Sequence, residues 1–212
     1  MIINPTKKAI INVSNDKYRK GQDRLEQSLQ GNTDADILMF KSEQEVGALP
    51  HSESMYGFKP MAFQKAYDIG YRKILWLDAS MYVIKNLEPI FDEIDKKGYF
   101  FQDSGWFNRQ WTNQETIYYF GTDKGKMISS GVLGLDMNTE QGYKFYEQWV
   151  TAMKKGLFNG SHDNHRHDQS SASLIIEKMG LEISENNYLW QYGQITEEPI
   201  HENILIIANG II

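Results

Sequence analysis

The chain of 212 residues contains no cysteine. This absence excludes disulfide bonds, thiolate zinc sites, iron–sulfur clusters and cysteine nucleophiles, and it leaves oxygen and nitrogen as the ligands for any metal. Long hydrophobic runs are also missing, since none approaches the roughly 18 apolar residues of a membrane-spanning helix. The N-terminal segment lacks the apolar core of a signal peptide. We therefore expect a cytoplasmic protein without a membrane span.

An excess of positive charge is missing as well. The 22 lysine and arginine residues are outnumbered by 28 aspartate and glutamate residues, which gives a net charge of −6 at pH 7. This balance disfavours a general nucleic acid binder, although it leaves a nucleic acid open as an acceptor. No repeat or linker divides the chain. At about 100–200 residues per domain, we expect a single domain over residues 1–212.

Segments of strand character alternate with segments of helical character. Strands are predicted at 8–13, 36–40, 73–77, 99–102, 132–136 and 204–208, and an extended segment at 81–84. Helices are predicted at 18–30, from 59 onward, at 87–94, between a cap at Thr139 and a stop at Gly156, and at 168–179. This order predicts an α/β fold with a mostly parallel sheet flanked by helices. Ligands of such sheets bind beyond the carboxyl ends of the strands.

The strand at 73–77 ends in an acid and a hydroxyl, Asp78-Ala79-Ser80. A carboxylate at that edge can hold a hard cation, and the cation can bridge a diphosphate. The alternative interpretation is that Asp78 only caps a turn after a buried strand. Asp78 and Ser80 are therefore candidate binding residues, with or without a cation.

Four motifs, in order, resemble those of nucleotide-sugar glycosyltransferases with the GT-A fold, and most closely the galactosyltransferase-like group of family 8. The first is a helix that opens with Lys59-Pro60. The second is the strand before Asp78-Ala79-Ser80, followed by Leu-Glu-Pro-Ile-Phe at 87–91. The third is the Ser-Ser-Gly-Val run at 129–132, and the fourth is the Asp168-Gln169 pair. The resemblance implies a Rossmann-like fold.

The same resemblance implies an activity. It predicts a hexosyltransferase that moves a sugar from a nucleotide diphosphate sugar, with a UDP-sugar as the expected donor, to a hydroxyl on a saccharide, protein or other polymer. Asp168 and Gln169 would be the catalytic residues near the anomeric carbon. Asp168 would accept the acceptor proton if the enzyme inverts configuration; otherwise it would bind sugar hydroxyls or only cap its helix. The implied donor-binding residues are Ser14, Asn15, Lys59, Asp78, Ser80, Ser130 and Gly131.

The individual roles follow the family pattern. Ser14 and Asn15 would hold the nucleotide, and Lys59 would offset the diphosphate charge at a helix N-terminus, unless it is a solvated surface lysine. Gly131 would let the backbone approach the donor sugar, unless it only forms a tight turn.

One position departs from the family. Ser80 stands where the family has the second acid of Asp-x-Asp. The resemblance implies Mn²⁺ or Mg²⁺, with Asp78 and His201 as candidate ligands. The missing acid also leaves open an enzyme that needs no metal, or a non-catalytic relative that binds a nucleotide or sugar.

A second class of function rests on His162, His165 and His167, which lie beside Asp163 and Asp168. Imidazoles at this spacing with adjacent carboxylates can collect a transition metal, so a metal-dependent hydrolase is the alternative. The other interpretation is a polar loop that leads into the helix at 168. The family resemblance further implies that the aromatic stretch at 106–120 and the loop at 41–53 shape the acceptor site.

Overall fold

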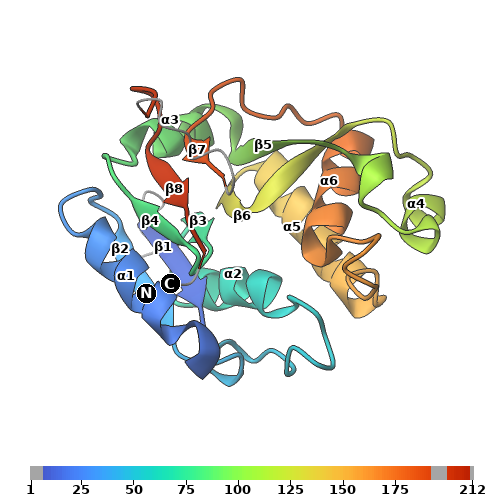
Figure 1. Cartoon of the computed structure of the whole chain (residues 1–212), viewed down its shortest axis with the longest axis horizontal. Coiled ribbons are helices and arrows are strands. Elements are labelled where there is room, and N and C mark those ends of the chain that lie inside the picture. The colour runs from blue at the N-terminus through green and yellow to red at the C-terminus, as the bar shows by residue number, and fades with distance from the viewer. Residues whose placement is uncertain (1–6, 192–199, 211–212) are drawn as a thin grey trace.

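The computed structural model describes residues 7–191 and 200–210, and its centre is a five-stranded sheet (Figure 1). The strand order is β2 (Asp36–Phe40), β1 (Lys8–Val13), β3 (Lys73–Leu77), β6 (Lys126–Asp136) and β5 (Tyr99–Phe107). β1 runs parallel to β2 and β3, whereas β6 is antiparallel to both β3 and β5. Four strands therefore point one way, which confirms the mostly parallel sheet, and β6 is the reversed strand.

Helices cover both faces of this sheet. On one face, α1 (Arg19–Leu29) and α3 (Glu88–Lys97) enclose a core that includes Ile10 and Leu75. On the other face, α2 (Phe58–Asp68), α5 (Glu140–Lys154) and α6 (His167–Met179) enclose a core that includes Ile11 and Trp76. Neighbouring residues of one strand serve opposite cores because strand side chains alternate between faces. The strands read as continuous apolar runs for this reason.

A second, three-stranded sheet fixes the segment that follows β3. β4 (Met81–Val83) pairs with β8 (Ile206–Ala208), and β8 pairs with β7 (Leu189–Trp190). The amide of Asn209 donates to the carbonyl of Ser80 at 3.1 Å. The Arg24 guanidinium donates to the same carbonyl at 3.0 Å and to the Gly210 carbonyl at 2.6 Å. The late part of the described chain therefore positions the loop that carries Asp78 and Ser80.

Two strands are longer than the sequence pattern predicts. β6 begins at Lys126, so Ser130 and Gly131 lie inside a buried strand and not in a turn before it. The start of β6 has no apolar alternation in the sequence, because its serine residues are buried against α6. The amide of Ile128, for example, donates to the Ser173 hydroxyl of α6 at 3.0 Å. β5 continues to Phe107 through two register shifts against β6, which break its alternation.

The helix α4 (Gln114–Phe120) lies within the aromatic stretch, where no helix was predicted. Its signals were present: the Asn113 side chain accepts from the amide of Thr116 at 2.9 Å, and Gly121 adopts a φ of 75° at its end. The predicted cap at Thr139 is confirmed, since its hydroxyl accepts from the amide of Gly142 at 3.1 Å. Among the described residues, no helix is both long enough and apolar enough to cross a bilayer.

Candidate functional site

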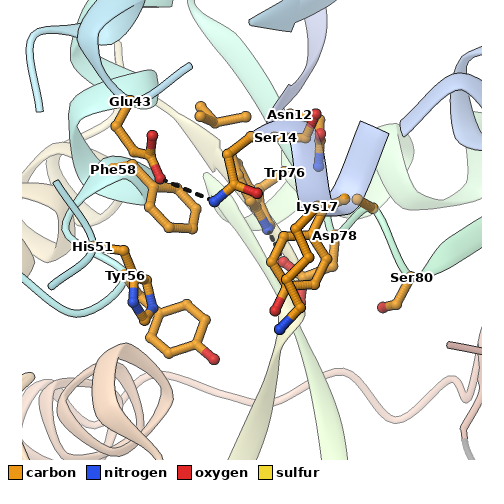
Figure 2. A pocket seen from close by; sticks show the side chains of 14 residues that line it. Asn12, Ser14, Lys17, Glu43, His51, Tyr56, Phe58, Trp76, Asp78 and Ser80 are labelled. Carbon is orange, nitrogen blue, oxygen red and sulfur yellow. Dashed lines mark hydrogen bonds between the residues drawn. The ribbon is translucent and has the colours of Figure 1, made fainter. Parts of the chain in front are cut away.

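A cavity of about 480 Å³ opens at the carboxyl ends of β1 and β3, where the α/β pattern predicted a ligand site (Figure 2). Ser14 follows β1 and Asp78 follows β3, so the parallel pairing of the two strands brings both residues to one edge. Figure 2 shows His51, Tyr56 and Phe58 on one side of the cavity, with Asp78 and Ser80 across from them. The predicted residues Ser14, Asn15, Asp78 and Ser80 all line this space.

A buried amide network holds the floor of the cavity. The Asn12 side chain donates to the Leu77 carbonyl at 2.6 Å, and the Gln22 side chain donates to Asn12 Oδ1 at 2.9 Å and to the Phe40 carbonyl at 2.8 Å. Both amides are fully buried. The network ties the ends of β1, β2 and β3 together. Sequence reasoning missed it because both residues fall within segments of otherwise ordinary strand and helix character.

Two polar atoms in the cavity wall have no hydrogen-bond partner within the described part of the chain. They are the hydroxyl oxygen of Ser14 and the side-chain oxygen of Asn15. The Asn15 amide nitrogen donates to Glu43 Oε1 at 3.4 Å, which leaves its oxygen directed elsewhere. A buried polar atom without a partner costs about 1–3 kcal/mol. A ligand in the cavity that reaches either oxygen with a hydrogen-bond donor would remove that cost.

Lys59 and two carboxylates form a buried ionic cluster behind the cavity. Lys59 Nζ lies 3.2 Å from Asp78 Oδ1 and 3.1 Å from Asp168 Oδ2. It also donates to the carbonyl of Ser130 at 3.1 Å and to its hydroxyl at 3.3 Å. Four predicted site residues from α2, β3, β6 and α6 therefore meet at one ammonium group, which the sequence could not show.

The electrostatics of this cluster follow from its burial. Burial by itself lowers the pKa of Lys59, but the negative charges of Asp168 and Asp78 outweigh it and raise that pKa above its ordinary value. Burial raises the pKa of Asp168, and the charge of Lys59 opposes this effect. Lys59 is therefore a permanent cation at neutral pH, and its single positive charge is shared between two acids.

This arrangement changes the roles expected for Lys59 and Asp168. Lys59 is 2% exposed and lines none of the three cavities described here, so it is not placed to contact a diphosphate directly. Asp168 is 3% exposed and lines none of them either, because its carboxylate faces Lys59. Asp168 lies in the first turn of α6 and is not the cap, since that position is Arg166. Both lie behind Asp78, to which Lys59 is paired at 3.2 Å.

Asp78 is the member of the cluster that reaches the cavity. Its side chain is 34% exposed, and its Oδ1 accepts from Trp76 Nε1 at 2.7 Å. Gly131 makes room beside it: a Cβ at that position would lie 2.5 Å from Met81 Cε and 3.1 Å from Asp78 Oδ2. The glycine is therefore needed for close packing within a strand and does not form a turn.

A second cavity of about 370 Å³ shares Asp78 and Ser80 with the first. Gln169 lines this second cavity, whereas its neighbour Asp168 does not. Other lining residues include Trp106 and Trp111 from the aromatic stretch, Ser129 from β6 and Arg166, which precedes α6. Two cavities that meet at one carboxylate can hold two ligands or two parts of one ligand at adjoining positions.

The three histidines of the cluster serve the local structure. His165 is fully buried; its Nε2 lies 3.0 Å from the Leu157 carbonyl, and its Nδ1 accepts from the amide of Asn113 at 3.4 Å. Burial lowers the pKa of His165 to about 4, so the ring is neutral at pH 7. His167 Nδ1 lies 3.0 Å from the Phe158 carbonyl, and its Nε2 lies 3.0 Å from His162 Nδ1.

These contacts occupy both ring nitrogens of His165 and His167 and the Nδ1 of His162. Within residues 7–191 and 200–210, no group of three or more histidine or acidic side chains is placed to hold a metal ion. The hydrolase centred on His162, His165 and His167 therefore has no metal centre in this part of the chain. The interpretation of the segment as a polar lead-in to α6 fits the geometry.

Two residues beside Lys59 have left-handed backbones, which is uncommon for residues other than glycine. Tyr56 has a φ of 55° and His167 a φ of 52°, and their rings stack at 5.3 Å. Tyr56 also lies 5.4 Å from Lys59 Nζ and 4.7 Å from the His51 ring. Strained backbone often concentrates at binding sites. The sequence offered no signal for this pair.

The candidate metal ligands Asp78 and His201 are not brought together by the described residues. His201 is exposed, and the carbonyl of the adjacent Glu202 accepts a hydrogen bond from Lys85. Lys85 follows the end of β4, whereas Asp78 precedes its start. At the cavity, the oxygen donors for a cation are Asp78 Oδ2 and the Ser80 hydroxyl, since Trp76 and Lys59 contact Oδ1. Such a set suits Mg²⁺ bound chiefly by phosphates and water.

Sequence comparisons found no match, either among family models or among curated proteins. Solved structures do resemble the fold. A glycosyltransferase involved in the glycosylation of the major capsid of PBCV-1 superimposes with a TM-score of 0.58 at 12% identity, covering 95% of this chain and 93% of that one. Mouse xyloside xylosyltransferase 1 superimposes with a TM-score of 0.54 at 12% identity, covering 96% of this chain and 97% of that one.

A third structure is larger. The bifunctional glycosyltransferase WbbM has a TM-score of 0.58 at 11% identity over 89% of this chain, which spans only 40% of the length of WbbM. At these identities the likeness concerns the fold. The chain has the α/β fold of GT-A glycosyltransferases, as the order of its motifs predicted.

Proposed function

We propose that this protein is a glycosyltransferase of the hexosyltransferase type. It would bind a nucleotide diphosphate sugar, with a UDP-sugar as the expected donor, and transfer the sugar to a hydroxyl acceptor. The observation that carries the proposal is the pair of cavities that meet at Asp78 and Ser80, at the carboxyl ends of β1 and β3. The GT-A fold and the unpartnered oxygens of Ser14 and Asn15 support it.

The first cavity suits the nucleotide. Aromatic rings of Tyr18, Tyr56, Phe58 and Trp76 line it, together with the polar atoms of Ser14 and Asn15. A planar base can pack against the rings, while the ribose and the diphosphate engage the polar edge. The diphosphate would extend from there toward Asp78 and Ser80, where the two cavities join.

The second cavity suits the transferred sugar. Gln169, Ser129 and Gly131 line it next to Asp78 and would contact the hydroxyls of that sugar. The proposed catalytic contact from α6 is therefore Gln169. Asp168 would be a positioning residue, because it holds the Lys59 ammonium that in turn orients Asp78. The buried ammonium also limits the negative charge that the diphosphate meets at this edge.

A divalent cation is the proposed cofactor, bound through Asp78 and Ser80. When bound, Mn²⁺ or Mg²⁺ would offset the charge that develops on the leaving diphosphate. Ser80 is well placed for a water-mediated contact, because Arg24 and Asn209 fix its backbone. An enzyme that needs no metal is the alternative that the serine leaves open.

A thermal-shift panel tests the proposal directly. UDP-, GDP- and CMP-sugars are each added with manganese and with a chelator, and hydrolysis of the donor is followed in parallel. We expect stabilisation by one nucleotide class and slow release of its free sugar. The absence of any response to all three nucleotides would contradict the transferase. Binding without donor cleavage or transfer would instead identify a non-catalytic relative.

A further inference from the structure

A third cavity of about 300 Å³ continues the groove beyond the second. The second and third cavities share Ser104, Leu189 and Gln191, whereas the first and third share no lining residue. The three cavities therefore lie in series, and Asp78 stands where the first cavity meets the second. A donor molecule accounts for the first space and the adjoining part of the second. The proposed donor placement leaves the remaining length of the groove open to a second ligand.

The wall of the second cavity presents an exposed aromatic ring. Trp106 is 48% exposed, and its ring meets Trp111 edge-on with the centroids 5.6 Å apart. The guanidinium of Arg166 lies 3.8 Å from the centroid of Trp111, and the Trp111 carbonyl accepts from the Ser170 hydroxyl at 2.6 Å. Trp111, which Arg166 and Ser170 hold in place, therefore fixes the position of the Trp106 ring. An aromatic face fixed in this way can pack against the apolar C–H face of a pyranose ring.

The third cavity has a different lining. Its side chains are almost all amides, hydroxyls and charged groups, and Leu189 is the apolar one among them. Amide groups offer both donors and acceptors, which suits a ligand covered with hydroxyls. The two carboxylates of Asp103 and Glu185 outnumber the ammonium of Lys126, which pairs with Asp103 at 2.6 Å. This lining disfavours a polyanion such as a nucleic acid, and it offers no pocket for an apolar peptide side chain.

We infer that the acceptor is a neutral glycan of at least two sugar residues, with the accepting sugar against Trp106 in the second cavity and the next sugar in the third. This inference rests on the proposed function, since it names the acceptor class of the same site. The two positions have separable roles. Trp106 contributes to binding of an acceptor of any length, whereas the third cavity contributes only when a second sugar is present.

Two variants separate these positions. Trp106→Ala removes the aromatic face of the second cavity. Asn187→Trp fills the third cavity from an exposed position; it also removes the Asn187 Oδ1 that accepts from the Gln102 side chain at 3.3 Å, so its melting temperature is compared with that of the unmodified protein. Gln141→Trp is the matched control, because it places the same large side chain at an exposed amide of α5 that lines none of the three cavities.

The experiment measures binding by saturation-transfer NMR on the full chain in the presence of UDP. The probes are the methyl monosaccharide, disaccharide and trisaccharide of glucose, galactose and mannose, with a short single-stranded RNA and a serine-rich peptide for comparison. In at least one sugar series, we expect the disaccharide to bind about tenfold more tightly than the monosaccharide, a difference of roughly 1.4 kcal/mol. Asn187→Trp should abolish this gain and leave the monosaccharide unchanged, and Gln141→Trp should preserve both.

Several outcomes overturn the inference. The first is equal affinity for the monosaccharide and the disaccharide in every series, and the second is a higher affinity for the disaccharide that survives in Asn187→Trp. The third is unchanged sugar binding in Trp106→Ala, and the fourth is preferential binding of the RNA or the peptide. Failure of the proposed function gives a different result. In that case no nucleotide stabilises the protein in the thermal-shift panel, whatever the glycans do.

Discussion

Lys59 Nζ lies 3.1 Å from Asp168 Oδ2, and both side chains are almost completely buried. The two residues are more than a hundred positions apart in the chain, and they join α2 to α6 directly behind the carboxylate that the two cavities share. A buried ion pair contributes little net stability by itself, but removal of one partner leaves an uncompensated charge. The pair therefore makes the shape of the site depend on the integrity of both helices.

The first prediction concerns the cation of this pair. Lys59→Met keeps the length and apolar stem of the side chain but leaves Asp168 buried without its partner. We expect the free energy of unfolding to fall by about 3–5 kcal/mol, measured by urea denaturation at pH 7. Lys65→Met, an exposed lysine on the same helix, is the control and should change it by no more than about 0.5 kcal/mol. Equal stability of the two variants would contradict the role assigned to Lys59.

How much of the site could be predicted from the sequence depends on how local each signal is. Ser14, Asn15, Asp78 and Ser80 were found because strand ends are local features, and parallel strands place their carboxyl ends at one edge. The roles of Lys59 and Asp168 could not be found in this way. Their partners come from other elements, so only the packed structure shows that each neutralises the other.

The strands of the fold were predictable because strand character is local, but the direction of each strand was not. Runs such as Lys73–Leu77 show strand character whichever direction their neighbours take, so alternation alone could not reveal that β6 is antiparallel. The polar start of β6 also carried no apolar pattern. The Ser130 hydroxyl accepts from Lys59 of α2, and the Ile128 amide donates to Ser173 of α6; these tertiary contacts override local propensity.

The second prediction is a pH dependence of stability that comes from His165. Its pKa falls from 6.5 in the unfolded chain to about 4 in the fold, because the ring is buried. Between these values the unfolded state binds a proton that the folded state does not, so stability decreases as the pH falls from about 6.5 to about 4. The full shift corresponds to about 3 kcal/mol.

Urea denaturation at a series of pH values measures this effect. His167 contributes in the same direction, because burial also lowers its pKa. His165→Gln removes the titrating group while it keeps a donor for the Leu157 carbonyl. We expect the slope of stability against pH to become smaller in this variant, even if its stability at pH 7 is reduced. An unchanged slope would show that His165 does not carry the effect.

The third prediction concerns the unpartnered hydroxyl of Ser14. Ser14→Ala should leave the free protein at least as stable, because the buried oxygen has no partner to lose among the described residues. The same change should weaken UDP binding about five- to tenfold, since a hydrogen bond contributes about 1 kcal/mol. Isothermal titration with UDP and thermal denaturation without it measure the two effects separately.

Ser28→Ala is the matched control for this prediction. The Ser28 hydroxyl donates to the Leu25 carbonyl at 2.8 Å and accepts from the amide of Val83 at 2.9 Å, and it lines none of the cavities. This variant should lose stability and retain its affinity for UDP. If Ser14→Ala instead destabilises the free protein and binds UDP normally, the hydroxyl has a structural role and does not contact the ligand.

The fourth prediction compares two glycines of β6. Gly131→Ala would place a methyl group 2.5 Å from Met81 Cε and 3.1 Å from Asp78 Oδ2, so it must displace the carboxylate or the flexible methionine. Gly134→Ala would place its methyl group 2.5 Å from Ile94 Cδ1 and 3.2 Å from Phe100 Cβ, inside the core and away from the cavities. Gly131→Ala therefore tests the site, and Gly134→Ala in the same strand is its control in the core.

Donor hydrolysis and thermal denaturation separate the two variants. We expect Gly131→Ala to lower kcat/KM for the donor at least tenfold, a loss of about 1.4 kcal/mol in transition-state stabilisation, because the added methyl group crowds Asp78 Oδ2 at the join between the cavities. Its melting temperature should fall less than that of Gly134→Ala, since the methionine can move and the isoleucine is packed in the core. Gly134→Ala should keep its kcat/KM at temperatures where it is folded. The reverse result, with Gly134→Ala impaired in hydrolysis and Gly131→Ala normal, would contradict the prediction that the methyl group beside Asp78 disturbs the reacting site.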